Sequence, residues 1–492
     1  MEVMQDTAIR TAGGDGWQRL LVEPRRPASI RNRPGAFWLA VAAVCVGAFM
    51  GQLDASIVTV ALPSLQQAFG VSVGAVTWVG LSYLLVLVAT VVAVGRFADM
   101  WGRKLLYVYG FGIFIVGSAL CGLAPGLGWL IGFRALQAVG AALLQANSVA
   151  IIVLAVPKPS VGKAIGIQGA AQAVGLALGP TVGGFLLAAG GWRLIFFVNV
   201  PFGLLGMVAG VLLIPRSRHL VDPTPFDWPG LALFVPAVLA VFTAISFGNQ
   251  RGWTSPAILG LLAAGTVLVA AFVVRQLRCA HPMLDLRLFR RPHFCPGVTS
   301  ALLSYLVMFG VLFLVPFYLE GHLGLGSGRA GLELMTMPVA LGIVAPVAGR
   351  LADRFGARPF TVTGMAGVGA CLLALGALRP TTPLFLVLLA GVGAGLGAFT
   401  PPNNASVMRA VPRQQAGLAS GVLNMTRGMG TSLGLAVTGL VFDAAGGTVS
   451  GSVAHAFSVT CVVLAACAVV AGVVAGISAG TRTPVPVELL AE

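Results

Sequence analysis

A ten-residue stretch occurs twice in the chain, as GRFADMWGRK at residues 95 to 104 and as GRLADRFGAR at residues 349 to 358. The two copies share Gly, Arg, Ala, Asp and Gly in register. Each copy is short and charged and follows a long apolar stretch, so each is expected to form a tight loop between two helices. The duplication predicts that the chain consists of two related halves.

The sequence around these loops is too apolar for a soluble protein. Of its 492 residues, 57% are hydrophobic and 9% are charged, whereas soluble domains usually carry about 25% charged residues. The charges lie in short patches between apolar stretches of about twenty residues, the length that crosses a hydrocarbon core of about 30 Å. The sequence therefore predicts an all-α polytopic membrane protein.

Fourteen apolar stretches have the length of a membrane span. They cover residues 36–60, 73–95, 105–124, 128–153, 164–188, 194–214, 229–247, 256–276, 296–319, 330–349, 360–378, 383–406, 416–441 and 454–478. Eight of them separate the two loops, so halves of six helices each leave two inserted helices, the seventh and eighth. The predicted organisation is a disordered tail (1–35), a six-helix bundle (36–215), the inserted pair (216–278), a second six-helix bundle (279–478) and a second tail (479–492).

The distribution of Lys and Arg predicts the orientation. Of the 30 basic residues, 24 lie on the side of the N-terminal tail and four on the other side. Because positive loops stay in the cytoplasm, both termini are predicted to be cytoplasmic. The net charge of +15 is spread over these loops, so it forms no continuous face for nucleic acid.

Other classes of protein lack support in the sequence. No Lys stands in a phosphate-binding loop, so uphill transport would depend on an ion gradient. Cys279, His281, His293 and Cys295 have spacings that match no usual zinc site, and no metal or other cofactor is predicted. No His accompanies a Ser or Cys nucleophile and a carboxylate, so the protein is not expected to be an enzyme.

Two ionisable residues lie within the predicted outer half of the membrane. Asp54 lies about 18 residues into the first span, and Arg134 lies one to two helical turns into the fourth span. A charge at mid-span costs about 2.5 to 3.5 kcal/mol on insertion scales. The pair is interpreted as a proton-coupling device, with Asp54 as the proton carrier and Arg134 as its modulator. The alternative is a static buried pair that fixes packing.

A third ionisable residue, Arg427, lies near the middle of the thirteenth span, in GVLNMTRGMGTSLG. It has no sequence-local partner and is interpreted as facing a water-filled substrate cavity. The alternative is a structural Arg that binds carbonyl groups of a broken helix.

The fifth span contains GIQGAAQAVGLALGPTVGG. Its small residues permit close helix contacts, and its Pro bends the helix, so this span is expected to seal one side of a central cavity. The residues of this spacing are Gly166, Gly175, Gly179, Pro180, Gly183 and Gly184.

The duplicated loops are interpreted as conformational latches. Asp99 and Asp353 can accept hydrogen bonds from backbone amides at a helix N-terminus, while Arg103 and Arg354 can pair with carboxylates. A basic loop that follows the orientation bias would explain the Arg residues but neither the Asp residues nor the duplication. The latch residues are Gly95, Arg96, Asp99, Gly102 and Arg103 in the first copy and Gly349, Arg350, Asp353, Arg354 and Gly356 in the second.

The order of these motifs resembles the fourteen-span drug:proton antiporters of the major facilitator superfamily. Similar to motifs of that family are LDASIVTVALP at 53 to 63, RALQAVGAALLQA at 134 to 146, WRLIFFVNVPFG at 192 to 203 and FDWPG at 226 to 230. The first of the duplicated loops, GRFADMWGRK, resembles the loop signature of the superfamily. The similarity covers residues 36 to 478. Within the superfamily the spacing of the fifth span is typical of export, so the resemblance implies a direction of transport.

The chain departs from the family pattern at three positions. Met100 stands where the loop motif often has a basic residue. Glu320 and Glu333 lie near the outer ends of the ninth and tenth spans, and Glu320 occupies a position where relatives often have an amide. The two acids are interpreted as lying near the outer entrance of a cavity, where their negative charge attracts cationic substrates. The alternative is that both are solvated carboxylates.

The resemblance implies proton-coupled efflux of amphipathic or cationic drugs or antibiotics by alternating access across the bacterial cytoplasmic membrane. The expected partners are the small-molecule substrate, protons and the bilayer, without nucleic acid, and the protein is expected to be a monomer. Two alternatives stay open. The protein could be a dedicated exporter of one self-made antibiotic, or, more remotely, an uptake symporter.

Overall fold

The computed structural model describes residues 23, 26–31, 33, 35–71, 73–217, 226–291, 293–321, 323–325, 327–378, 382–446 and 453–478. Within this part of the chain every regular element is a helix and strands are absent, which confirms the all-α class. The tail predicted at 479–492 and most of the tail predicted at 1–35 lie outside the described residues.

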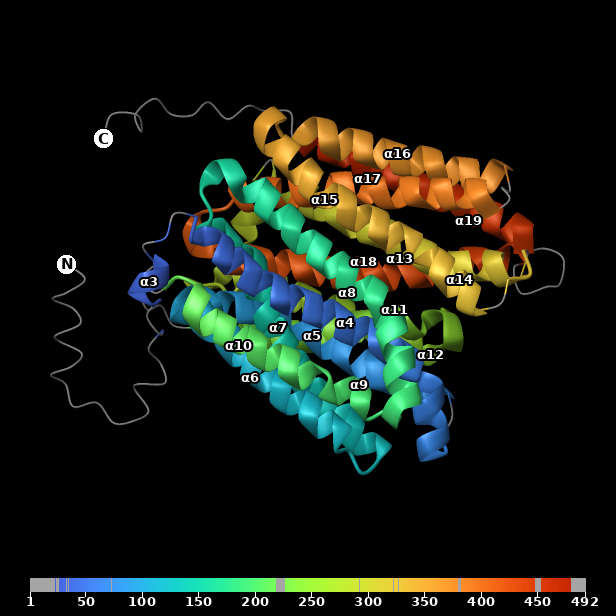
Figure 1. Ribbon diagram of the computed structural model, residues 1–492, viewed down its shortest axis with the longest axis horizontal. Helices are drawn as coiled ribbons and strands as arrows, with labels where there is room; N and C mark the ends of the chain where they lie inside the picture. Colours follow the sequence, from blue (N-terminus) through green and yellow to red (C-terminus); the bar gives the residue numbers. More distant parts are fainter. Residues whose placement is uncertain are drawn as a thin grey trace, which may run out of the picture.

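The helices follow the predicted order. The first half contains α4 (Phe37–Phe69), α5 (Val73–Trp101), α6 (Arg103–Gly122), α7 (Leu127–Ala155), α8 (Val161–Gly190), α9 (Leu194–Phe197) and α10 (Asn199–Leu213). The next two are α11 (Trp228–Arg251) and α12 (Pro256–Arg278). The second half contains α13 (Phe294–Gly321), α14 (Ser327–Leu334), α15 (Thr336–Phe355), α16 (Ala357–Leu378), α17 (Thr382–Arg409), α18 (Ala416–Ala444) and α19 (Val453–Ser478). Figure 1 shows α4 to α10 gathered on one side and α13, α15, α16, α17 and α19 on the other.

The helices have the dimensions of membrane spans. Twelve in the described chain are long and apolar enough to cross a bilayer, and the bent helix α8 brings the number to thirteen. Helix α18, with 29 residues, is not in this set, and its middle carries Asn424, Thr426 and Arg427. The count of fourteen spans and the placement of both termini stay predictions.

The first helix is longer than the span predicted at 36–60, which agrees with the apolar part of the helix, Phe37–Val58. The apolar stretch ends near residue 60, but α4 continues to Phe69 and stops at Gly70, whose φ of +60° few other residues adopt readily. The added turns are anchored because Ile57, Ala61 and Leu65 are buried in one apolar cluster. The helix therefore continues beyond its apolar stretch because one face of these added turns is buried.

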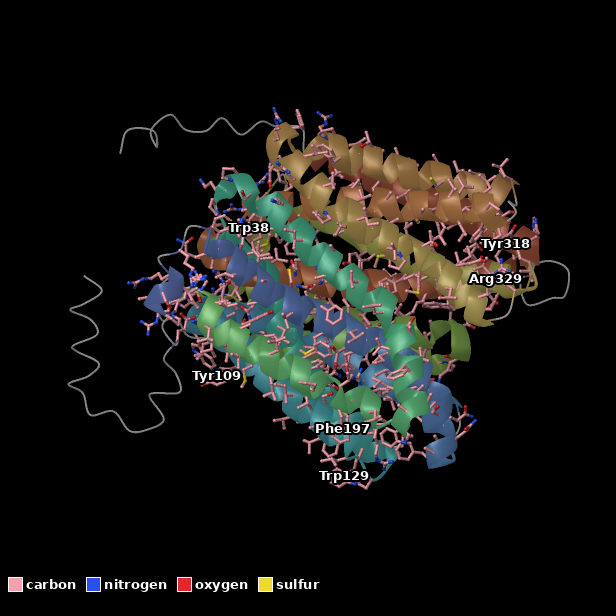
Figure 2. All side chains as sticks on the ribbon, viewed as in Figure 1. Trp38, Tyr109, Trp129, Phe197, Tyr318 and Arg329 are labelled. Atoms are coloured by element: carbon pink, nitrogen blue, oxygen red, sulfur yellow. The ribbon has the colours of Figure 1, made fainter. Side chains whose placement is uncertain are left out.

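The outside of the helices is apolar, as expected for a surface in lipid. Phe185 and Ile477 are 73% and 72% exposed. In Figure 2, Trp38 and Tyr109 lie toward one end of the helices, while Trp129 and Phe197 lie toward the other. Aromatic side chains at both ends of a helical bundle are typical of the two membrane–water interfaces.

The two halves meet through close contacts of glycine. At Gly95 on α5, a Cβ atom would overlap the carbonyl of Gly417 on α18. At Gly349 on α15, the equivalent position in the second repeat, it would overlap the carbonyl of Gly162 on α8. The first Gly of each duplicated loop is thus required for helix contact between halves.

The second Gly of each copy has a different role. Gly102 and Gly356 have φ of +108° and +88°, a region that favours glycine, and each ends one helix before the next begins. The duplicated sequence therefore encodes the same turn twice.

Candidate functional site

Asp54 on α4 lies at the centre of a buried polar network and has no exposed surface. Its Oδ2 accepts a hydrogen bond from Arg134 on α7 at 2.8 Å. Its Oδ1 accepts from Gln137 on α7 at 3.0 Å and from Asn199 on α10 at 2.8 Å. All three partners donate N–H groups, an arrangement that stabilises the ionised carboxylate.

Arg134 is held on several sides. It donates to the side-chain oxygen of Gln137 at 2.8 Å and, through Nε, to the carbonyl of Val79 on α5 at 3.3 Å. Its guanidinium carbon lies 4.2 Å from the centre of the Tyr83 ring, a cation–π contact. The residue is 1% exposed. The predicted pair is thus part of a larger network that joins α4, α5, α7 and α10.

Two members of this network, Gln137 and Asn199, were not predicted from the sequence. Neither carries a charge, so a search for ionisable residues in spans passes over both. A signal was available in each case. Gln137 lies one turn after Arg134, and Asn199 lies within the family motif WRLIFFVNVPFG. Asn199 also donates to Ser118 on α6 at 3.1 Å, which extends the network to a fifth helix.

The first duplicated loop binds a helix of the other half. Asp99 on α5 accepts from the backbone N–H groups of Gly417 and Leu418 at 2.8 and 2.9 Å, at the start of α18. Arg103 pairs with the same carboxylate at 2.5 Å. The carboxylate thus meets unpaired amides of a helix N-terminus, where negative charge is favoured.

The second loop repeats this contact in the opposite direction. Asp353 on α15 accepts from the N–H groups of Gly162 and Lys163 at 2.9 and 2.8 Å, at the start of α8. Its cationic partner is Arg409 on α17 at 2.7 Å. Arg354, which was expected to pair with a carboxylate, is exposed and lies over the Phe355 ring. Together these contacts define the Asp99 latch and the Asp353 latch.

Helix α8 packs against both halves through its small residues. A Cβ at Gly175 or Gly183 would crowd α4, and one at Gly179 would overlap the side chain of Ser56. A Cβ at Gly166 would crowd α15, whereas Gly184 faces open space. The segments Lys158–Gly179 and Thr181–Gly190 meet at 43°, and the side chain of Pro180 between them lies outside the described part.

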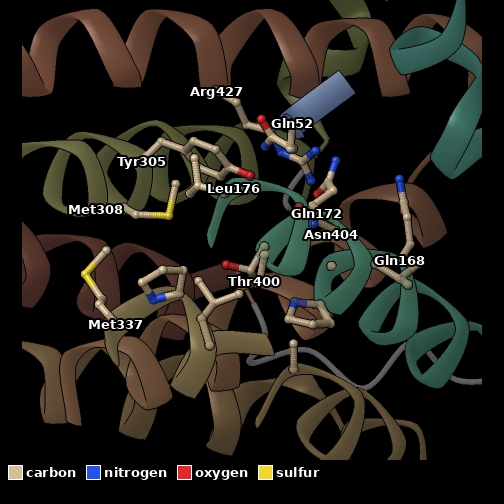
Figure 3. Close-up of a pocket in the computed structure, with 17 residues that line it drawn as sticks. Gln52, Gln168, Gln172, Leu176, Tyr305, Met308, Met337, Thr400, Asn404 and Arg427 are labelled. Atoms are coloured by element: carbon tan, nitrogen blue, oxygen red, sulfur yellow. The ribbon is translucent and has the colours of Figure 1, made fainter. Parts of the chain in front are cut away.

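A cavity lies between the halves and is shown in Figure 3. About 640 Å³ of space, part of it open to solvent, lies between its walls. Helices α4, α8, α13, α15, α17 and α18 contribute its walls. The polar side chains in its lining are Gln52, Gln168, Gln172, Tyr305, Thr400, Asn404 and Arg427.

The structure separates two of the three residues that were predicted to form the substrate site. Arg427 lines the cavity. Glu333 on α14 is outside the lining and pairs with Arg329 at 3.2 Å, near the end of the helices where Figure 2 labels Arg329. The side chain of Glu320 lies outside the described residues. The amides Gln52, Gln172 and Asn404, which sequence reasoning missed, accompany Arg427 instead.

Comparison with known proteins gives the family. Residues 44–278 and 297–488 match the family model described as Major Facilitator Superfamily. The chain is 34% identical over 401 residues to riboflavin transporter RibZ of Clostridioides difficile, across 81% of this chain and 87% of that protein. It is 35% identical over 413 residues to multidrug resistance protein Stp of Mycobacterium tuberculosis, across 82% and 76%.

Two further similarities agree. The tetracenomycin C resistance and export protein of Streptomyces glaucescens is 32% identical over 421 residues, across 84% of this chain and 77% of that protein. The fold matches the crystal structure of the E. coli fucose:proton symporter FucP with a TM-score of 0.65 at 15% identity, across 91% of this chain and all of that one. The two matched segments cover nearly the whole chain, and several relatives are named for drug or antibiotic resistance, as the motifs predicted. The chain is a membrane protein that belongs to the Major Facilitator Superfamily.

Proposed function

We propose that the protein exports an amphipathic drug or antibiotic across the bacterial cytoplasmic membrane in exchange for protons. The observation that carries the proposal is the fully buried carboxylate of Asp54, held by Arg134 and two amides. A carboxylate that binds a proton loses its charge, so the same three donors then hold it less tightly. Protonation of Asp54 would therefore loosen α7 and α10 from α4.

The loosening of α7 and α10 would act on the latches, which hold the two halves together. Each connects the two halves at one end of the helices through a carboxylate and two backbone amides. If the loops are cytoplasmic, as the distribution of Lys and Arg predicts, the closed latches correspond to a state that faces outward. Opening both latches would expose the cavity to the cytoplasm, which is the alternating access expected of two packed halves.

A dedicated exporter of one antibiotic is the second candidate. It is favoured by the similarity to the protein named for resistance to and export of tetracenomycin C. The similarity to a riboflavin transporter also keeps a single metabolite, moved in either direction, as an alternative. The breadth of the substrate range separates these candidates, because a dedicated exporter would respond to one compound of a panel.

The test is proton release from acidified everted membrane vesicles. Aromatic antibiotics and dyes of both charges are added one at a time while the lumenal pH is recorded. At least one compound should release protons with the unaltered protein, and Asp54→Asn should abolish the release. The matched control is Asp443→Asn, which changes an exposed carboxylate at the end of α18.

Loss of folding is distinguished from loss of coupling by counterflow, the exchange of substrate across the membrane without a gradient. Asp54→Asn should keep counterflow, because exchange of substrate needs a folded carrier but no net movement of protons. Proton release that persists in Asp54→Asn would contradict the role of Asp54. Release by no compound with the unaltered protein would contradict the proposed function.

A further inference from the structure

Arg427 gives the cavity a positive charge. It is the one charged residue in the described lining, and the other polar lining residues are neutral amides, a hydroxyl and a phenol. The side chain is 7% exposed, and its Nε has no hydrogen-bond partner. A guanidinium stays protonated in proteins, so this charge is permanent.

No carboxylate balances this charge within the described residues. The Nη1 of Arg427 donates to the neutral oxygen of Asn424 at 3.1 Å, and its guanidinium carbon lies 5.4 Å from the centre of the Tyr305 ring. Among the acids that the structure describes in the spans, Asp54 pairs with Arg134 and Glu333 pairs with Arg329. An ionised group in a low-dielectric site is costly without an opposite charge, so an anion is the preferred occupant.

The rest of the lining indicates the shape of that occupant. In Figure 3, Gln52 and Gln172 project into the same space as Arg427. Their side-chain amides can donate to the oxygens of a ligand or accept from its hydroxyls. Leu176, Met308 and the Tyr305 ring add apolar surface beside them, and thioether and phenol groups pack well against aromatic rings.

We propose that this cavity binds the exported compound as an aromatic organic anion, with its carboxylate or phenolate on Arg427 and its ring system against Tyr305 and Met308. The inference rests on the proposed function and names the substrate class of the same transporter. It replaces the attraction of cations to Glu320 and Glu333, because the structure places Glu333 away from the lining and pairs it with a cation.

The experiment compares two dyes that share one ring system. Fluorescein methyl ester is an anion, and rhodamine 123 is a cation with the same xanthene ring and methyl ester. Uptake of each dye into energised everted vesicles is measured by filtration, with the full chain and with vesicles that lack it. The anion should enter at least about tenfold faster than the cation, since a charge-assisted hydrogen bond discriminates by about that factor.

Three variants locate the preference. Arg427→Gln should lower uptake of the anion about tenfold without lowering uptake of the cation. Arg427→Lys keeps the charge and should keep the preference for the anion. The matched control is Arg251→Gln, which removes an exposed Arg at the end of α11, and it should leave both rates unchanged.

Four results would overturn the inference. They are faster uptake of rhodamine 123 by the unaltered protein, uptake of neither dye, an unchanged rate for the anion in Arg427→Gln, and loss of the preference in both Arg427 variants. Rhodamine uptake coupled to proton release would leave the proposed function intact while removing the anionic substrate. If no compound of the wider panel releases protons, the proposed function itself fails.

Discussion

Removal of Asp54 and removal of Arg134 have different consequences, because the two side chains differ in what they can do when unpaired. A carboxylate left alone in an apolar site can take up a proton and become neutral, whereas a guanidinium cannot lose its charge. The remaining partners of Arg134 are all neutral; they include Gln137, Val79 and the rings of Tyr83 and Phe196. Asp54 is therefore the more important member of the pair for stability.

We expect Asp54→Asn to destabilise the protein more than Arg134→Met does. An uncompensated buried charge costs about 3–5 kcal/mol, and the neutral partners reduce this for Arg134. The double variant should be more stable than Asp54→Asn alone, because it contains no unpaired charge. Thermal unfolding of the purified proteins in one detergent measures the order. A lower unfolding temperature for Arg134→Met than for Asp54→Asn would contradict this account.

At the scale of single helices, α8 depends on glycine at the positions where α4 crosses it. Gly179→Ala adds a methyl group that overlaps the side chain of Ser56, whereas Gly184→Ala adds one that meets nothing within 4 Å. Overpacking costs about 1–3 kcal/mol. We expect Gly179→Ala to lower the unfolding temperature and the transport rate and Gly184→Ala to lower neither. Equal effects of the two substitutions would contradict this packing.

The two latches should be separable by hydrogen–deuterium exchange. Asp99→Ala removes the acceptor for Gly417 and Leu418, so amides at the start of α18 should exchange faster, by about tenfold or more if one charge-assisted hydrogen bond is lost. Asp353→Ala should have the same effect at the start of α8, on Gly162 and Lys163. Each variant is the control for the other. Faster exchange at both helices in either variant would show that the latches open together.

A third carboxylate, that of Asp227, connects α11 and α12, the two helices that lie between the halves in the sequence. Asp227 accepts from Gln276 at 2.8 Å, from Arg275 Nε at 2.9 Å and from the Gly230 amide at 3.0 Å. Burial raises the pKa of Asp227, but these hydrogen bonds and the charge of Arg275 outweigh it, so the pKa lies below its ordinary value. A lowered pKa stabilises the folded state above the pKa of the unfolded chain. This contribution is lost as the pH falls through the folded pKa.

Asp227→Asn should therefore lower the unfolding temperature at pH 7. The difference from the unaltered protein should shrink as the pH falls below about 4, because the native carboxylate then gains a proton and loses its ionic contacts. Thermal unfolding over a series of pH values in detergent is the measurement. Asp443→Asn, at an exposed position, should show no such convergence, and a constant difference down to pH 3 for Asp227→Asn would contradict the assignment.

At the scale of the whole molecule, the features that the sequence predicted best were the contacts of the duplicated loops and the positions of the helices. The duplicated stretch predicted that Asp99 and Asp353 meet helix N-termini, and hydropathy located nearly every helix. The cavity amides were missed because an uncharged Gln or Asn in a span gives no signal of the face on which it lies. Arg354 was expected to pair with a carboxylate, but the cation that pairs with Asp353 is Arg409 on the neighbouring helix. The pair of Arg329 and Glu333 lies one helical turn apart and could have been found from spacing alone.

The predicted topology can be tested on the full chain. If the N-terminus is cytoplasmic and all fourteen helices cross the membrane, the C-terminus is also cytoplasmic. The turn near Gly252, between α11 and α12, then lies outside. Green fluorescent protein fused after Glu492 should then fluoresce, and alkaline phosphatase inserted after Gly252 should be active. An inactive phosphatase at Gly252, with a fluorescent C-terminal fusion, would mean that α11 and α12 do not both cross the bilayer.

The exchange of helix caps between the halves is reciprocal. The Asp of the first repeat caps a helix of the second half, and the Asp of the second repeat caps a helix of the first. This is the contact pattern of an isologous dimer, in which one surface patch binds its own copy across a two-fold axis. The covalent connection through α11 and α12 is then not needed to specify the pairing. We expect two separately expressed fragments, divided between α12 and α13, to assemble into one carrier.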